Sequence, residues 1–315
     1  MAQENELLSE LPHGERIRSR RLKGGVAMII ADATGLAEAE RGALESEIRA
    51  ATLAIPGVDE ARVALTVAEP GRKLVAIGSG KGGVGKSTIA ANLAVALARS
   101  GRKVGLIDAD IYGPSQPTLL GSDSKPTAEE DRLIPVEAHG LKFLSLGQLV
   151  SPGHALAWRG PMATGALARL VEADWGDAEL LLVDLPPGTG DVQLSLIQRS
   201  RPAGAVIVST PQDLSLIDAR RAIDLFNKMN VPVLGVIENM ATYACPHCGE
   251  ESHPFGSGGA EAAAAEMGVP FLGRLPLSPA IREASDAGNP PAASDGDDAD
   301  AFAAIAAKLL AAVAH

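Results

Sequence analysis

The stretch IGSGKGGVGKSTIAANLA, residues Ile77–Ala94, matches two glycine-rich motifs that belong to different folds. Gly78, Gly80 and Gly83 fit the GxGxxG fingerprint of a dinucleotide-binding turn, whereas Gly80–Ser87 fit the phosphate-binding pattern GxxxxGK(S/T). The stretch follows an apolar run, LVAIGS, and opens a helical run, which is the context that a phosphate-binding loop requires. A dinucleotide turn uses neither a lysine nor a magnesium-binding serine after its glycines. The stretch therefore favours a site for a nucleoside triphosphate.

The residue types in this loop predict how it would hold phosphate. Lys86 would neutralise the β- and γ-phosphates, and the Ser87 hydroxyl would ligate Mg²⁺. Backbone N–H groups of the loop and of the helix start would cradle the phosphates. The residues expected to contact the nucleotide in this way are Gly80, Lys81, Gly82, Gly83, Val84, Gly85, Lys86, Ser87 and Thr88.

Two further strand-like runs end in an aspartate. KVGLIDAD carries Asp108 and Asp110, and LLLVDLPP carries Asp184. The first pair resembles the acidic residue that holds a ribose in a dinucleotide site. A second aspartate after another apolar run instead suits a carboxylate that holds the water ligands of magnesium, so we assign that role to Asp108 and Asp184. A helix-capping role is the alternative for either residue taken alone.

The alternation of apolar and helical runs predicts an α/β fold. From residue 73 onward, apolar runs separate helical stretches such as STIAANLAVALARS and SLIDARRAIDLFNKM. Continuous apolar runs suit parallel strands covered on both faces, so we expect a mostly parallel sheet flanked by helices. We place this domain at residues 70–315 and a small α/β domain at residues 1–69. The segment GNPPAASDGDDAD, 288–300, is expected to be an exposed loop.

The composition and net charge of the chain limit its possible binding partners and its cellular location. The chain has 315 residues and a net charge of −11, which argues against a general nucleic-acid binder. The basic segment RIRSRRLK, 16–23, is interpreted as a solvated helix end or loop. No run reaches the ~20 apolar residues that span a bilayer, and the terminal helix AFAAIAAKLLAAVAH is expected to pack on the domain. We expect a cytoplasmic protein with no membrane and no nucleic-acid partner.

The second lysine of the loop, Lys81, points to a narrower group. KGGVGKST resembles the deviant phosphate-binding loop of the family that contains the nitrogenase iron protein, the arsenite-pump ATPase and the septum-site regulator MinD. This resemblance implies that Lys81 reaches across a homodimer to the partner's nucleotide and acts there as an arginine finger does elsewhere. A plain solvated loop lysine is the alternative.

Five further motifs narrow the resemblance. DADIYGPSQPTLLG, DLPPGTGDVQL, ENMATYACPHCG, FGSGGA and LPLSPAIREASDAGNPP resemble the Mrp (ApbC) group of iron–sulfur cluster carrier ATPases. The resemblance covers most of residues 73–292 and implies ATP hydrolysis coupled to delivery of a cluster to apo iron–sulfur proteins. It also implies that Asp110 positions the attacking water and that Asn239 contacts adenine. Residues 1–69 resemble, more weakly, a small iron–sulfur-assembly domain, but they lack a cysteine.

The only two cysteines, Cys245 and Cys248, form one CPHC turn. Two thiolates are too few for a closed metal site, so a four-thiolate site needs a second chain. The dimer implied by Lys81 supplies that chain, and the resulting site could hold a bridging four-iron four-sulfur cluster. The alternatives are a bridging zinc ion and a redox pair, and His247 could compete as a ligand. A rival function is a MinD or partition type of switch that positions a partner on membrane or DNA.

Overall fold

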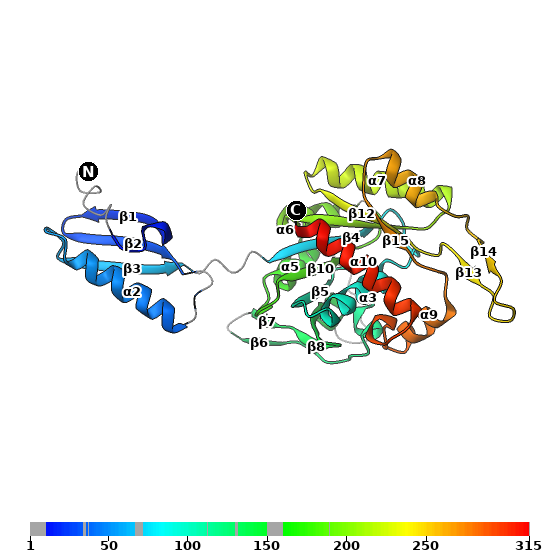
Figure 1. The fold of residues 1–315 in the computed structure, drawn as a ribbon, viewed down its shortest axis with the longest axis horizontal. Helices are drawn as coiled ribbons and strands as arrows, with labels where there is room; N and C mark the ends of the chain where they lie inside the picture. The colour runs from blue at the N-terminus through cyan, green and yellow to red at the C-terminus, as the bar shows by residue number, and fades with distance from the viewer. Residues whose placement is uncertain are drawn as a thin grey trace. The chain divides into compact units, whose positions relative to one another are not determined.

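The computed structural model divides the chain into two compact units, Met1–Arg72 and Lys73–His315. The residues that it describes are 11–33, 36, 38–66, 72–111, 113–129, 132–149, 160–188 and 190–314. The predicted boundary between residues 69 and 70 lies outside these residues. Figure 1 shows the elements of each unit.

In its described residues, the N-terminal unit forms a three-stranded sheet with one α-helix on one face. Its elements are η1 (Gly14–Arg16), β1 (Ile17–Lys23), β2 (Val26–Asp32), α2 (Glu38–Leu53) and β3 (Glu60–Thr66), with the sheet order β1-β2-β3. Along β2 every second residue is buried, as expected of a sheet with one covered face. The interpretation of residues 16–23 as a helix end or loop was wrong. Most of the segment forms β1, which pairs antiparallel with β2, because strand pairing outweighs the high charge of the segment.

The C-terminal unit is built on a sheet in which, among the described strands, only the edge strand β8 runs antiparallel to its neighbour. The strand order is β15-β12-β11-β4-β10-β5-β9-β8. The strands are β4 (Lys73–Ser79), β5 (Val104–Asp108), β8 (Val136–Ala138), β9 (Leu141–Ser145), β10 (Leu180–Asp184), β11 (Gly204–Ser209), β12 (Val233–Glu238) and β15 (Phe271–Arg274). Two small antiparallel pairs are β6 (Thr127–Glu129) with β7 (Arg132–Ile134), and β13 (Tyr243–Ala244) with β14 (Glu251–Ser252).

Helices cover both faces of this sheet, which confirms the predicted fold class. Alternate strand residues belong to two separate apolar cores: Ile77 packs with one set of helices, and its neighbour Ala76 packs with the other. The first face carries α3 (Lys86–Arg99), α9 (Pro279–Asp286) and α10 (Asp297–Ala314), and the second carries α5 (Gly160–Val171), α6 (Asp191–Ser200), α7 (Asp213–Lys228) and α8 (Gly259–Glu266). The remaining short helices are α4 (Gln116–Leu119), η2 (Leu146–Leu149) and η3 (Pro291–Ala293).

The C-terminal end of the chain packs on the domain as expected. Phe302 and Leu309 of α10 are buried in the core shared with α3. The expectation for residues 288–300 was wrong in part, because Ala292 in η3 is buried and its N–H donates to Asn92 Oδ1 at 2.9 Å. Across the described part of the chain, no helix has the length and apolar character needed to span a membrane.

The register of the central strands positions the site. Because β4, β10 and β5 are parallel and adjacent, their carboxyl ends lie along one edge of the sheet. Asp184 at the end of β10 pairs in register with Ile77 on β4 and with Asp108 on β5. Ligands of open α/β sheets bind outside the carboxyl ends of the strands. The loop and both aspartates are therefore at the edge where a ligand is expected.

Candidate nucleotide site and cysteine hairpin

The loop between β4 and α3 needs glycine at two positions, where a side chain would collide with neighbouring atoms. A Cβ on Gly80 would lie 2.2 Å from the backbone carbon and oxygen of Asp218 on α7. Gly85, the residue before α3, has φ = 82°, and a Cβ there would lie 2.3 Å from Asn239 Nδ2. Only glycine fits these positions, because one has no space and the other has both a left-handed backbone and a close neighbour. The loop is therefore held against α7 and against the end of β12.

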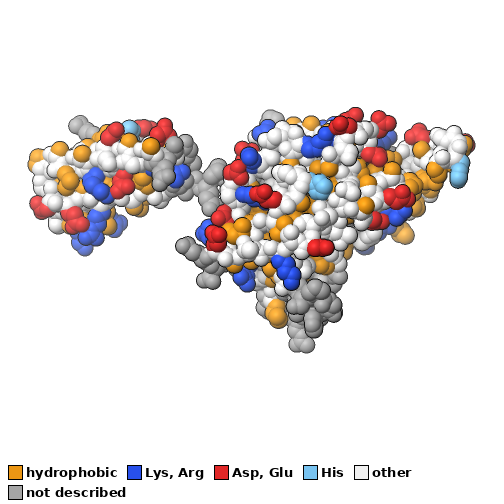
Figure 2. Space-filling model, turned by 90° about the horizontal axis from the view of Figure 1, so that it is seen from below, with side chains coloured by type: hydrophobic (Ala, Val, Ile, Leu, Met, Phe, Trp, Pro, Cys, Tyr) orange, Lys and Arg blue, Asp and Glu red, His pale blue; other side chains and the backbone are white. Residues whose placement is uncertain are grey.

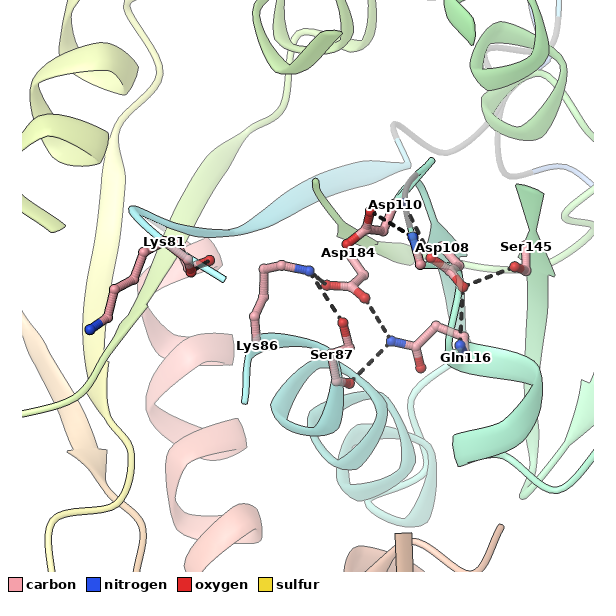
Figure 3. Close-up of polar contacts among 10 residues, drawn as sticks. Lys81, Lys86, Ser87, Asp108, Asp110, Gln116, Ser145 and Asp184 are labelled. Atoms are coloured by element: carbon pink, nitrogen blue, oxygen red, sulfur yellow. Dashed lines mark hydrogen bonds and ion pairs between the residues drawn. The ribbon is translucent and has the colours of Figure 1, made fainter. Parts of the chain in front are cut away.

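Lys86 and Asp184 form a buried ion pair. Lys86 Nζ lies 2.5 Å from Asp184 Oδ1, and the two side chains are 6% and 0% exposed. Lys86 Nζ also donates to Ser87 Oγ at 3.2 Å. Figure 3 shows the three side chains converging from the loop and from the end of β10. The structure thus brings together three residues that sequence analysis assigned to phosphate and magnesium.

Gln116 completes this arrangement and was missed by the sequence analysis. Its Nε2 donates to Asp184 Oδ2 at 2.9 Å and to the Ser87 carbonyl at 3.1 Å, and its backbone N–H donates to Asp108 Oδ2 at 3.0 Å. Gln116 is fully buried at the start of α4 (Figure 3). Nothing in a lone glutamine after a proline-rich turn signals the two contacts of its side chain, because Ser87 and Asp184 lie 29 and 68 residues away in the sequence.

Asp108 is a fully buried carboxyl with several donors. Besides Gln116, Ser145 Oγ donates to Asp108 Oδ2 at 2.9 Å and the Asp110 N–H donates to Oδ1 at 3.2 Å. Burial, and then the negative charge of nearby Asp184, raise the pKa of Asp108 to about 7 despite these hydrogen bonds. Two carboxylates in one buried site repel each other, so the site is suited to a cation. Ser145, at the end of β9, was also missed.

Asp110 lies beyond the end of β5 and is 9% exposed. Its Oδ1 accepts from the Gly113 N–H at 3.3 Å. Figure 3 shows Asp110 on the same side of the sheet edge as Asp184 and Lys86. The structure therefore places the third predicted aspartate beside the other two.

Lys81 lies apart from Lys86. Its Nζ donates to Gln212 Oε1 at 3.3 Å, just before α7, and Figure 3 shows its side chain directed away from Lys86. Two large apolar side chains on the adjoining turns of α7 are exposed, Leu214 at 72% and Ile217 at 48%. In a single chain Lys81 therefore does not join the cluster around Asp184, and its partner Gln212 directly precedes the helix that carries these exposed side chains.

Asn239 lies between the loop and a cavity. Its Nδ2 donates to the Val84 carbonyl at 2.8 Å, and its backbone N–H donates to the Ser209 carbonyl at 2.8 Å. The cavity has a volume of about 200 Å³. It is lined by Gly85, Thr88, Ile89, Asn239, Met240, Pro276, Leu277, Ser278, Ile281, Arg282, Ser285, Asp286 and Phe302. It adjoins the start of α3 and thus the phosphate-binding loop.

The cysteines lie on a hairpin that Figure 1 shows projecting from the body of the unit. The turn between β13 and β14 is closed by hydrogen bonds from the Cys245 N–H to the Glu250 carbonyl and from the Gly249 N–H to the Cys245 carbonyl. Cys248 is exposed, Cys245 is half-buried, and both are free thiols. The His247 N–H, followed by the N–H and thiol of Cys248, holds the pKa of the Cys245 thiol below its usual value. This favours the thiolate, which is the form that binds metals.

Within the described residues no group of three or more His, Cys, Asp and Glu side chains is arranged to hold a metal ion. Among the described residues, the two thiols of the hairpin therefore do not belong to a group of three or more potential ligands. On the face of the C-terminal unit shown in Figure 2, Lys and Arg side chains are interspersed with Asp and Glu and form no continuous basic stripe.

A glycine-rich loop between a strand and a helix, a buried lysine and two strand-end aspartates define a P-loop nucleoside triphosphatase. The family model described as "ParA: NUBPL iron-transfer P-loop NTPase" matches residues 71–310, and the chain belongs to this family. The chain is 47% identical over 297 residues to an iron-sulfur cluster carrier protein of Deinococcus radiodurans, covering 90% of this chain and 84% of the relative. It is 51% identical over 228 residues to the carrier of Pseudomonas fragi, covering 71% and 79%.

Solved structures agree with the family. A nucleotide-binding protein of Archaeoglobus fulgidus in complex with ADP has 38% identity and a TM-score of 0.63, covering 72% of this chain and 90% of its own. The cell division ATPase MinD of Pyrococcus furiosus has 26% identity and a TM-score of 0.59, covering 76% and 99%. The resemblance to the cluster carriers and to the MinD superfamily, noted from the sequence motifs, is confirmed.

Proposed function

We propose that the protein is an ATP-hydrolysing iron–sulfur cluster carrier that works as a homodimer and transfers a cluster to apo-proteins. The observation that carries this proposal is the pair of accessible cysteines on a projecting hairpin of an iron-transfer P-loop NTPase. Relatives that bear the name iron-sulfur cluster carrier protein support it at about 50% identity. We assign two kinds of partner: scaffold proteins that supply the cluster and apo iron–sulfur proteins that receive it. We assign no nucleic-acid or membrane partner, and we place the protein in the cytoplasm.

The nucleotide is assigned to the edge of the sheet. Residues Gly80–Thr88 cradle its phosphates, with Lys86 neutralising the β- and γ-phosphates. The cavity beside Asn239 receives the adenine base. Support comes from the continuity between the loop and that cavity, which share Gly85 and Thr88.

Magnesium is assigned to the same edge. The Ser87 hydroxyl and the carboxylates of Asp108 and Asp184 are hard oxygen donors, which is the donor set that Mg²⁺ prefers. When bound, Mg²⁺ supplies positive charge to the phosphate oxygens. Ser87 would ligate the ion, and the two aspartates would hold its water ligands. The buried negative charge of the pair supports this assignment.

Two residues are assigned to turnover. Asp110 orients the attacking water, since it lies at the strand end beside Asp184. Lys81 acts on the partner's nucleotide after two chains assemble, because within one chain it is held by Gln212 away from Lys86. The exposed Leu214 and Ile217 beside it support an interface with a second copy on this side of the molecule.

The cluster is the cargo, and its site is shared. Each chain offers Cys245 and Cys248, and among the described residues no group of three or more potential metal ligands includes them. Two chains related by a two-fold axis would together present four thiolates, which is the ligand set of a four-iron four-sulfur cluster. Such a bridging cluster would be accessible for transfer.

Anaerobic reconstitution with iron and sulfide tests the proposal. We expect about four irons per dimer and a four-iron four-sulfur Mössbauer signature. Cys245→Ser or Cys248→Ser should abolish stable loading of the cluster. ATP hydrolysis should partly survive, because the phosphate-binding loop follows β4 and the cysteine hairpin follows β12. The loaded protein should then activate an apo-protein that requires a four-iron cluster. Four irons on a strict monomer would refute the shared site, and one zinc per dimer with no iron uptake would refute the carrier function.

A further inference from the structure

We propose that Gln116 is the positioning residue of the magnesium site, holding Asp184 in place when Lys86 leaves it for the phosphates. This inference rests on the proposed assignment of ATP and Mg²⁺ to the loop. Its starting point is that one residue contacts all three segments that carry the site. Gln116 reaches Ser87 on the loop, Asp184 at the end of β10 and Asp108 at the end of β5, at 3.1, 2.9 and 3.0 Å respectively.

Nucleotide binding changes the partners of Asp184. Among the described residues, its carboxylate has two side-chain partners: Lys86 on Oδ1 and Gln116 on Oδ2. Once Lys86 turns to the phosphates, Gln116 is the remaining one of these two. A carboxylate that is fully buried and loses its cation is otherwise free to rotate or to take up a proton. The amide of Gln116 therefore keeps Oδ2 fixed while Oδ1 is released toward Mg²⁺.

The chemistry of an amide suits this position. Asp108 and Asp184 are both completely buried, and the charge of Asp184 acts on Asp108. A lysine between them would neutralise the carboxylates and compete with the metal ion. A glutamine donates hydrogen bonds without adding charge, so the negative charge remains available to Mg²⁺.

The energetics of the buried amide decide which measurement separates a positioning role from a packing role. Gln116 Oε1 is buried and has no hydrogen-bond partner among the described residues. The amide cannot be turned to relieve this, because both of its acceptors, on Asp184 and Ser87, face Nε2. Gln116→Met removes this unpaired acceptor, but it leaves the buried acceptors on Asp184 and Ser87 without their donor, so we expect a loss of stability. The response to Mg²⁺, and not stability, is therefore the readout that distinguishes positioning from packing.

The test measures how much Mg²⁺ strengthens the binding of a non-hydrolysable ATP analogue. In Gln116→Met we expect the affinity without Mg²⁺ to stay within about twofold of wild type, while the gain from Mg²⁺ falls roughly tenfold or more. This magnitude corresponds to losing one hydrogen bond to a charged group. Gln116→Asn, whose amide is one methylene short of Asp184, should show the same effect if the methionine variant does not fold.

Asn92→Leu is the matched control. Asn92 is also a fully buried amide with two hydrogen bonds, to the Thr88 carbonyl and from the Ala292 N–H, but it contacts neither aspartate. Its replacement should lower the melting temperature and leave the gain from Mg²⁺ within about twofold of wild type. In an Asp184→Asn background, Gln116→Met should add less than about twofold, because Gln116 acts through Asp184.

The outcomes distinguish two failures. If the wild-type protein gains no affinity from Mg²⁺, or Asp184→Asn keeps the full gain, the magnesium assignment fails and the inference fails with it. If both of those results are as expected but Gln116→Met retains the full gain, only the role of Gln116 is refuted. An undiminished effect of Gln116→Met in the Asp184→Asn background refutes it as well.

Discussion

The pH dependence of stability should report the burial of Asp108. Its pKa is raised from 3.8 to about 7, first by burial and then by the charge of Asp184. Below pH 3.8 the carboxyl is protonated whether the chain is folded or unfolded. Between pH 3.8 and about 7 the unfolded chain loses the proton and the folded chain keeps it, so stability falls as pH rises. Above about pH 7 the cost of the buried charge is fully present.

The magnitude follows from the width of this window. A shift of about three units at about 1.4 kcal/mol each gives roughly 4 kcal/mol in total, of which roughly 3 kcal/mol lies between pH 5 and pH 8. The Asp108→Asn variant has no carboxyl that titrates at this position. Between pH 5 and pH 8, its free energy of unfolding should therefore fall by roughly 3 kcal/mol less than that of wild type. The absolute stability of the variant is not the readout, because Asn also changes the hydrogen bonds to Gln116 and Ser145.

Urea unfolding followed by tryptophan fluorescence measures this difference. Both tryptophans, Trp158 and Trp175, belong to the C-terminal unit, so the signal reports the unit that contains Asp108. Nucleotide and Mg²⁺ are left out, since both alter the charge around the carboxyl. Asp177→Asn is the control: the pKa of Asp177 is lowered by Lys103, and its replacement should leave the slope unchanged. If the free energy of unfolding changes in parallel for wild type and Asp108→Asn from pH 5 to pH 8, the pKa of Asp108 is not raised by burial.

Two further predictions concern the loop. Lys86→Ala should lose most nucleotide binding and most ATPase activity. Lys81→Ala should keep much of the nucleotide affinity and lose turnover, because Lys81 acts only across the dimer. Equally large losses of nucleotide binding in calorimetric titrations of both variants would contradict the trans role of Lys81. Gly80→Ala should destabilise the C-terminal unit by about 1–3 kcal/mol in urea unfolding, since its Cβ would lie 2.2 Å from the Asp218 backbone. Gly82→Ala is the matched control, with its nearest neighbour atom at 3.9 Å, and an equal loss of stability there would exclude the steric explanation.

Several residues of the candidate site could be predicted from local sequence patterns. Lys86 and Ser87 could be assigned from eight consecutive residues, because a phosphate-binding loop is a backbone conformation that nearby residues specify. Asp108 and Asp184 could be placed together because the carboxyl ends of parallel strands meet along one edge, whatever the strand order. The buried C-terminal helix followed from its apolar composition alone.

The contacts between the side chains of the site depend on the tertiary structure. Gln116 lies 68 residues from Asp184 along the chain, and Lys86 lies 98 residues from it, so no local pattern records either contact. The direction of Lys81 toward Gln212 depends on how α7 packs beside the loop, across 131 residues. The raised pKa of Asp108 requires both burial and a neighbouring carboxylate, and β1 forms from a highly charged segment because β2 offers it an edge to pair with. Sequence periodicity specifies backbone and burial, whereas contacts between distant side chains exist only once the strands have been ordered in the sheet.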